Sequence, residues 1–226
     1  MVKKGLANIL SKLDERDWFQ ILIDEIFEQE KRPSRVIDYF YASWAGDCPR
    51  AIQYNMNGLM PDDFDAQGRR RMDNGNYMHT RYGDYFKGTK RLIDEEPVFK
   101  KELDGVFVSG RGDLIVKSDV DSKTLIELKS INDRKFKLIL PDPDEGDYLQ
   151  WNLCAKALGF LSGIILYENK NTQEIKYHHV TFDEKRYKIV IDDFIMIDKH
   201  NKLGTLAPRP EKCPNSFFCP MKKTCK

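Results

Sequence analysis

The chain has 226 residues, of which 41% are hydrophobic and 32% are charged, so it can bury a core and is not compositionally disordered. Its 37 Lys and Arg residues against 36 Asp and Glu residues give a net charge of +1, which argues against a polybasic protein but allows local basic patches. The longest nearly unbroken apolar stretch, residues 159–167, is shorter than the ~20 residues of a membrane helix, and no signal-peptide core is present near the start. We therefore expect a soluble cytoplasmic protein with no membrane segment.

The N-terminal part of the sequence is predicted to be helical. Apolar residues recur at helical spacing through residues 1–33, where Pro33 ends the pattern. A second helical region is expected to begin with Asp47 as N-cap and Pro49 in the first turn, and to end at residues 57–58. Residues 59–71 are predicted to be a polar connection, followed by a helix over 73–87. We assign residues 1–40 to an N-terminal helical segment and 41–226 to a single domain.

The C-terminal part of the sequence changes to the two-residue period of strands. Strands are expected over 98–107 and 110–116, joined by a tight turn, over 124–130, and in a hairpin of 163–168 with 174–182. Helices are predicted from Asp147 to Gly159 and from Asp183 to about Lys202, whereas 205–226 has no periodicity. This alternation favours an α/β or α+β domain around a central sheet.

A pair of acidic residues on neighbouring strands indicates a metal site. Side chains alternate along a strand, so Glu127 and Lys129 share one face. A symmetric hairpin centred on Val120 would set Asp113 opposite Glu127, with Cβ atoms only ~4.5–5.5 Å apart. Two carboxylates this close repel each other unless a cation lies between them, and such oxygen ligands suit Mg²⁺ or Mn²⁺. With a lysine beside the ion, this set predicts phosphodiester hydrolysis.

The three-residue pattern Glu-x-Lys alone is not specific, because it also occurs at Glu168 and at Glu174. We interpret the pattern at Glu174 as an exposed charge pair on a strand and the one at Glu168 as part of a hairpin turn. Only Glu127 has an upstream aspartate on an apolar strand at matching register.

The motif Asp113…Glu127-x-Lys129 resembles that of the PD-(D/E)XK nucleases, and residues 40–226 are similar to their RecB-like branch, which includes the iron–sulfur exonucleases associated with CRISPR adaptation and the AddAB-type nuclease domain. The resemblance implies a restriction-endonuclease-like mixed sheet flanked by helices. It implies that His79, which follows Gly75, and the carbonyl of Leu128 complete the metal shell. Gln150 matches the start of the family's Q-x-x-x-Y motif, but Cys154 occupies the tyrosine position.

The cysteines indicate a second metal site. There are five, an odd number without a secretory signal, so clustered thiols point to metal rather than to disulfides. The resemblance implies a structural [4Fe–4S] cluster that connects one cysteine before the nuclease core to three in the tail: Cys48, Cys213, Cys219 and Cys225. The five-residue spacing between the first two tail cysteines is wider than in the family, which leaves a [2Fe–2S] cluster or a zinc site open.

Basic residues border the predicted metal site and are candidates for phosphate contacts. They precede the His79 helix or follow the Glu-x-Lys strand: Arg69, Arg70, Arg134, Lys135 and Lys137. A solvated surface explains such runs equally well. The function we expect is a DNA nuclease, specifically a single-strand exonuclease. The alternatives are a nucleic-acid-binding subunit of a helicase or integrase assembly, in which a partner supplies any ATP-driven unwinding because this chain has no P-loop, and an endonuclease or junction resolvase on the same fold.

Overall fold

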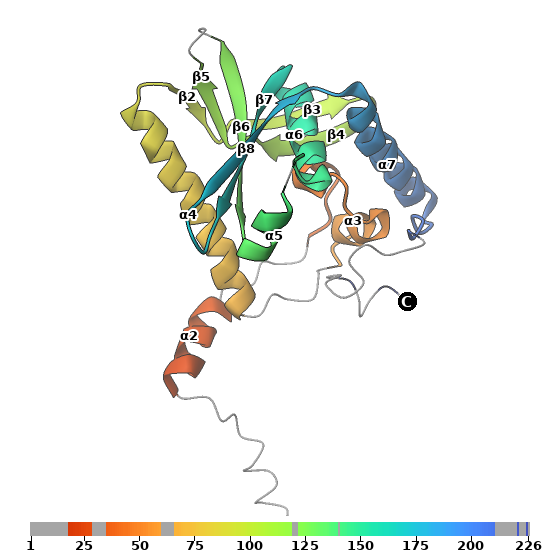
Figure 1. The fold of residues 1–226 in the computed structure, drawn as a ribbon. Helices are drawn as coiled ribbons and strands as arrows, with labels where there is room; N and C mark the ends of the chain where they lie inside the picture. Colours follow the sequence, from red (N-terminus) through yellow and green to blue (C-terminus); the bar gives the residue numbers. More distant parts are fainter. Residues whose placement is uncertain are drawn as a thin grey trace, which may run out of the picture. The chain divides into compact units, whose positions relative to one another are not determined.

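The computed structural model describes residues 18–28, 35–59, 66–118, 122–139, 141–210, 221 and 225. The chain divides into two compact units, one of residues 1–33 and 64–73 and the other of residues 34–63 and 74–226. Helix α2 (Trp18–Glu28) belongs to the first unit, and helix α4 (Ala66–Gly88) begins there and continues into the second. The remaining elements belong to the second unit (Figure 1).

The second unit contains two β-sheets. One has the strand order β2-β5-β6-β7-β8, formed by β2 (Leu92–Glu95), β5 (Leu114–Lys117), β6 (Lys123–Ile131), β7 (Ser162–Asn169) and β8 (Ile175–Thr181). It is mixed, because β6 and β7 are parallel and the other pairs are antiparallel. The other sheet has the order β1-β4-β3, formed by β1 (Phe40–Tyr41), β4 (Val106–Arg111) and β3 (Val98–Leu103). The predicted mixed α+β architecture is confirmed, but the strands form two sheets rather than one.

A long bent hairpin joins the two sheets. Its tip is the Asp104–Gly105 turn, where both residues have positive φ angles of 46° and 90°, the conformation that Asp-Gly favours in tight hairpins. Strands β3 and β4 form the part near the tip, and β2 and β5 form the far part in the other sheet. The bend lies at Glu96–Pro97 and Gly112–Asp113, where Gly112 N donates to Pro97 O at 3.0 Å and Glu96 N to Asp113 O at 2.8 Å. Proline has no N–H for a sheet ladder, so the strands break there.

The strand boundaries predicted from the sequence are therefore partly wrong. The expected strand over 98–107 spans the hairpin turn, and the expected strand over 110–116 spans the bend at Gly112–Asp113. By contrast, the β5–β6 pairs, from Leu114 with Ile126 to Lys117 with Lys123, are centred on residue 120, as predicted. The β7–β8 hairpin is also confirmed.

Helices cover both faces of the five-stranded sheet. The part of α4 in the second unit packs Met78 against Leu114 and Leu128 on one face. On the other face, α6 (Glu145–Leu158) packs against both sheets and against α7 (Glu184–Leu203). The indole of Trp151 on α6 is fully buried and donates from Nε1 to Leu125 O at 3.3 Å. Smaller elements complete the unit: η1 (Ala42–Trp44), α3 (Pro49–Met56) and α5 (Asp133–Leu138).

Several helix ends differ from the sequence prediction by a few residues. The N-cap of α3 is Cys48, not Asp47, and the N-cap of α6 is Asp144, not Asp147. Helix α4 begins at Ala66, within the stretch predicted to be a connection, and α5 and β2 were not predicted. The predicted start of α7 is confirmed, with Asp183 as its N-cap.

Part of the predicted N-terminal helix, residues 1–17, and most of the tail lie outside the described residues. Of the helices that the structure describes, none combines the length and the apolar character that a membrane crossing needs.

Candidate active site

Asp113 and Glu127 are brought together at the bend of the long hairpin. Asp113 directly precedes β5, and the β5–β6 register places it beside Glu127 on β6. Both side chains are buried, with 6% and 2% of their surfaces exposed. Asp113 Oδ2 accepts a hydrogen bond from Leu128 N at 2.6 Å, so the carboxylate is anchored to the strand that carries Glu127.

The two buried carboxylates produce a negative electrostatic potential that favours a nearby positive charge. Burial disfavours the ionised form of Glu127, and the negative charge of Asp113 adds to this effect, so the pKa of Glu127 is raised to about 7. Lys129 opposes the shift but does not cancel it. A cation at this point would be bound favourably.

Lys129 is held against Glu127 by several partners. Its Nζ lies 2.9 Å from Glu127 Oε1 and donates to Gln150 Oε1 at 2.9 Å, and Gln150 Nε2 donates to Glu127 Oε1 at 2.7 Å. Burial alone would lower the pKa of Lys129, but the charges of Glu127 and Asp147 raise it above its ordinary value. The ammonium group therefore stays protonated at neutral pH.

Asp147 is a residue of this site that the sequence analysis missed. It was predicted to cap α6, but Asp144 accepts hydrogen bonds from Gly146 N and Asp147 N and fills that role. Asp147 instead faces the site from the first turn of α6, with Oδ1 at 3.6 Å from Lys129 Nζ. Its three-residue separation from Gln150 places both on one helix face, and this spacing was the available signal.

His79 on α4 completes the group. Its Nδ1 lies 3.2 Å from Asp113 Oδ1, and the Asp113 carboxylate raises the pKa of His79 against the opposing effect of burial. The structure thus brings together the predicted residues Asp113, Glu127, Lys129, His79 and Gln150.

The side chains of this group are of the types that bind a divalent ion, although they are not arranged as a complete coordination shell. Within the part of the chain that the structure describes, no three His, Cys, Asp or Glu side chains surround a common point. However, among these residues Glu127 Oε2 is buried and makes no hydrogen bond, and the one partner of His79 Nδ1 is the carboxylate of Asp113. A buried oxygen without a partner is unfavourable, and an ion liganded by oxygen and imidazole nitrogen would satisfy it.

Cys154 stands where the Q-x-x-x-Y pattern has its tyrosine, and the charges of Glu127 and Asp113 add to the burial that raises the pKa of its thiol. Cys154 is fully buried, and its thiol contacts Arg111 O at 3.8 Å, as expected for a small core residue. Tyr148 donates its hydroxyl hydrogen to Thr181 O at 2.7 Å, and the Trp151 indole bonds to the backbone of β6. Neither aromatic side chain takes the place of the tyrosine.

The basic residues after β6 lie on α5, and two of the three are paired within the chain. Lys137 Nζ lies 2.7 Å from Asp133, and Lys135 Nζ lies 3.3 Å from Asp144 and 3.7 Å from Asp147. The side chain of Arg134 has no ion pair among the described residues. Lys135 therefore shares Asp147 with Lys129, which connects α5 to the site.

Arg69 and Arg70 belong to the first unit. Arg70 forms an ion pair with Asp24 on α2 at 3.1 Å. Their role in nucleic-acid binding stays a prediction.

Of the four cysteines predicted to bind a cluster, two lie in the described part of the chain. Cys48 caps α3 and is half-buried, as is Cys225, and both are free thiols. Cys213 and Cys219 lie outside the described residues.

We expect the metal-free protein to lose stability as the pH rises from about 4.5 to about 7. The pKa of Glu127 is 4.5 ordinarily and about 7 in the folded protein, so the folded state binds more protons in this window and is favoured at its acidic end. The raised pKa of His79 acts in the same direction, because its ion pair with Asp113 is complete below pH 6.5 and is lost as the pH rises through the folded-state pKa.

Urea unfolding in EDTA at pH 5 and at pH 8 measures the difference in the free energy of unfolding between the two pH values. Glu127→Gln should reduce it by up to about 3 kcal/mol, whereas Glu102→Gln, at an exposed position on β3, should leave it unchanged. Equal pH dependence in wild type and Glu127→Gln would contradict the assignment.

Comparisons with known proteins show which solved structures resemble this fold. No protein-family model and no curated protein matches the sequence. The solved structure of SSO0001 aligns with a TM-score of 0.60 and 17% identity over 92% of this chain and 95% of that chain. The alkaline exonuclease LHK-Exo from Laribacter hongkongensis aligns with a TM-score of 0.49 and 13% identity over 80% of this chain and 93% of that chain. The likeness to SSO0001 shows a shared fold, so the function rests on the residues of the site.

Proposed function

We propose that this protein is a metal-dependent deoxyribonuclease that hydrolyses phosphodiester bonds. One observation carries the proposal: the buried carboxylates of Asp113 and Glu127 lie beside a protonated lysine and a histidine, and Glu127 Oε2 has no hydrogen-bond partner among the described residues. This combination of hard ligands and a fixed cation suits the cleavage of an anionic ester.

The metal would be Mg²⁺ or Mn²⁺, held by Asp113, Glu127, His79 and the carbonyl oxygen of Leu128. When bound, such an ion supplies charge stabilisation for the phosphate and activates the attacking water. Asp113 is positioned for this role because its hydrogen bond to Leu128 N fixes one carboxylate oxygen and leaves Oδ1 on the side of His79.

Lys129 acts as a cation in this proposal, not as a proton acceptor. Its pKa lies above the ordinary value, so it remains an ammonium group that donates hydrogen bonds. A fixed donor of this kind stabilises negative charge that develops on the phosphate and can orient the attacking water.

Gln150 and Asp147 are positioning residues. Gln150 bonds to both Glu127 and Lys129, and Asp147 supports Lys129 from the other side. Both come from the first two turns of α6, so the helix holds the lysine at a defined place above the strand.

Within this function we propose a single-strand DNA exonuclease, in agreement with the family resemblance. The buried carboxylate pair with a lysine held against it argues against a purely DNA-binding subunit, although association with a helicase or recombination partner is compatible with it. An endonuclease or junction resolvase on the same fold can be distinguished from an exonuclease by its substrate, because only an endonuclease cuts closed circular DNA.

We also propose a structural [4Fe–4S] cluster bound by Cys48, Cys213, Cys219 and Cys225, with [2Fe–2S] or zinc as alternatives. It is supported by the way the chain enters the tail. Gln53 on α3 donates to Thr205 O and accepts from Ala207 N, both at 2.7 Å, and Arg50 donates to Ala207 O at 2.9 Å. The helix that begins at Cys48 is therefore bonded to the segment that leads into the tail.

Lys129→Ala should reduce the rate of DNA hydrolysis by about 10²- to 10³-fold, because a fixed charge at the reacting phosphate is removed. Cleavage of end-labelled single-stranded DNA with Mg²⁺ or Mn²⁺ measures the rate, and EDTA should abolish it. Lys176→Ala is the matched control, since it lies in a second Glu-x-Lys sequence but bonds to Phe136 O at 2.8 Å. Cleavage that is unaffected by Lys129→Ala would reject the proposed function. Cutting of closed circular DNA would select the endonuclease alternative.

Asp147→Asn should lower kcat about tenfold without raising KM for DNA, because Lys129 loses a charged support while Lys135 loses an anionic partner. Asp144→Asn is the control: it weakens the ion pair of Lys135, retains an N-cap residue and does not touch Lys129. It should leave kcat unchanged. Equal kcat values for the two variants would show that Asp147 does not position Lys129.

Cys48→Ser should abolish cluster binding, whereas Cys154→Ala should retain it because Cys154 is a buried core residue. Iron and sulfide content and visible absorption of the purified protein provide the measurement. About four irons per chain support [4Fe–4S], about two support [2Fe–2S], and a colourless protein with one zinc refutes the iron assignment.

A further inference from the structure

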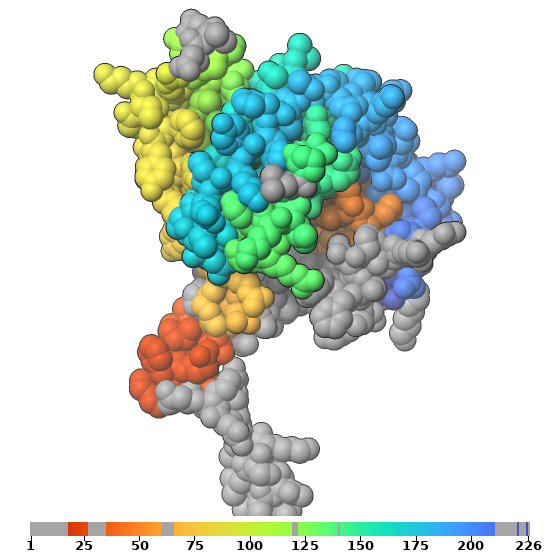
Figure 2. Space-filling view, in the orientation of Figure 1, coloured from red at the N-terminus to blue at the C-terminus, as the bar shows by residue number. Residues whose placement is uncertain are grey.

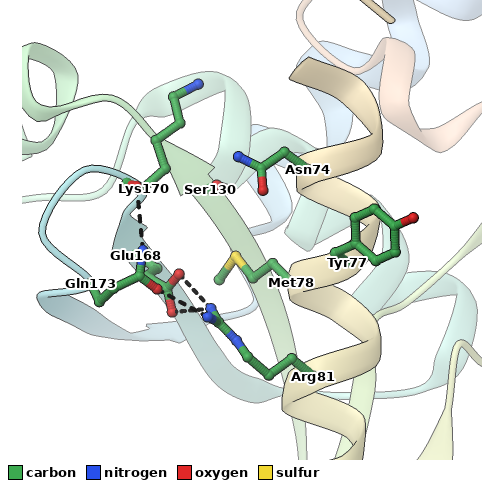
Figure 3. Close-up of a pocket in the computed structure, with 8 residues that line it drawn as sticks. All are labelled: Asn74, Tyr77, Met78, Arg81, Ser130, Glu168, Lys170 and Gln173. Atoms are coloured by element: carbon green, nitrogen blue, oxygen red, sulfur yellow. Dashed lines mark hydrogen bonds and ion pairs between the residues drawn. The ribbon is translucent and has the colours of Figure 1, made fainter. Parts of the chain in front are cut away.

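A small polar pocket lies between α4 and the carboxyl ends of β6 and β7. Its volume is about 110 Å³. The residues that line it come from α4, β6 and the β7–β8 hairpin: Asn74, Tyr77, Met78, Arg81, Ser130, Glu168, Lys170 and Gln173 (Figure 3). Pockets that enclose whole small molecules have roughly 300 Å³ or more, so this pocket can take only a small group of a larger ligand.

The floor of the pocket is a closed polar network. Glu168 is buried and accepts from Arg81 at 2.5 and 2.6 Å and from the Tyr82 hydroxyl at 3.0 Å. Arg81 also donates to Gln173 Oε1 at 3.0 Å. The negative charge of Glu168 is therefore fully matched and does not repel an anion.

The groups above this floor are available to a ligand. Figure 3 shows Lys170 and Asn74 on either side of Ser130, away from the Arg81–Glu168 pair. Among the described residues, none of these three side chains forms a hydrogen bond or ion pair, and all three can donate. An ammonium, a hydroxyl and an amide from residues that line one small pocket are donors that suit a phosphate group.

Exposed tyrosines border the pocket. Tyr77, which also lines it, is 74% exposed, and Tyr85 is 61% exposed. With Arg81 between them they follow at four-residue intervals on one face of α4. Tyr177 on β8, 58% exposed, pairs with Leu166 and so shares the sheet face of Glu168. The β7–β8 hairpin and α4 are neighbours (Figure 2), so Tyr77 at the pocket is accompanied by exposed rings on the same two elements that line it.

We propose that this tyrosine–lysine surface, made of Tyr77, Tyr85, Tyr177, Asn74, Ser130 and Lys170, binds a single-stranded segment of DNA. A backbone phosphate occupies the pocket and unpaired bases stack on the tyrosines. Exposed rings stack on any unpaired base, whereas the bases of a duplex are already stacked on each other. Only one part of this inference rests on the proposed nuclease function, namely that the bound strand is also the strand that is cleaved.

The position of the surface relative to the catalytic group supports this role. Ser130 directly follows Lys129, and because side chains alternate along β6, the two point to opposite faces at the same strand end. A strand that passes over the carboxyl end of β6 reaches both. The surface would therefore hold the part of the strand that adjoins the cleaved bond.

The test is binding of a fluorescent single-stranded oligonucleotide in EDTA, where no metal-dependent cleavage occurs. Tyr77→Ala should weaken binding about tenfold and should have no effect on binding of the same oligonucleotide with abasic sites, and Tyr77→Phe should bind as wild type. Lys170→Gln should weaken binding of both oligonucleotides and reduce the slope of log K against log salt by about 0.7. Phe107→Ala and Lys202→Gln, exposed residues on β4 and α7, are the matched controls and should change nothing.

Three results would overturn the proposal. These are no binding by the wild-type protein, wild-type affinity of both Tyr77→Ala and Lys170→Gln, or an equal loss of affinity of Tyr77→Ala for normal and for abasic DNA. Displacement of the oligonucleotide by inorganic phosphate at equal concentration would assign the pocket to the free anion instead. The binding test contains no metal and is therefore independent of the cleavage test. Failure of the nuclease proposal would appear as unchanged cleavage by Lys129→Ala, whatever the binding result.

Discussion

The burial of two carboxylates side by side is the constraint around which the candidate active site is organised. Asp113 and Glu127 repel each other and have lost most of their water. Each neighbouring group reduces this unfavourable energy: Leu128 N bonds to Asp113, while Lys129 and Gln150 bond to Glu127. Because the compensation is incomplete, the pKa of Glu127 stays high. A protein retains such an arrangement when something that binds there makes use of it.

The sequence predicted the centre of the site because that part depends on local geometry. The symmetry of the hairpin about residue 120 determines the β5–β6 register, and alternation along the strand then places Lys129 beside Glu127. The role of Asp147 could not be obtained in this way. Asp142, Asp144 and Asp147 all precede or begin α6, and each is a reasonable N-cap by residue type. The spacing of Asp147 three residues before Gln150 was the one local signal that separates it from the other two, and its pairing with Lys129 depends on the tertiary structure.

Strand β2 and the environment of Glu168 were missed for a similar reason. Strand β2 has the sequence LIDE, which is short and without clear alternation, and its place is defined by pairing with β5. Glu168 was interpreted as part of a turn, yet it is buried and paired with Arg81, a residue 87 positions earlier in the chain. The same Glu-x-Lys pattern thus occurs twice on adjacent strands, once in the catalytic group and once in the floor of a pocket. Long-range partners decide between the two outcomes.

The bend of the long hairpin determines where Asp113 lies relative to Glu127. Gly112 and Asp113 connect a strand of the three-stranded sheet to a strand of the five-stranded sheet, and their backbone is bonded to the parallel break at Glu96–Pro97. Asp113 therefore sits at the joint between the sheets, whereas Glu127 lies wholly within the five-stranded one. A movement of one sheet relative to the other would act first on Asp113, while Glu127 would keep its place on β6.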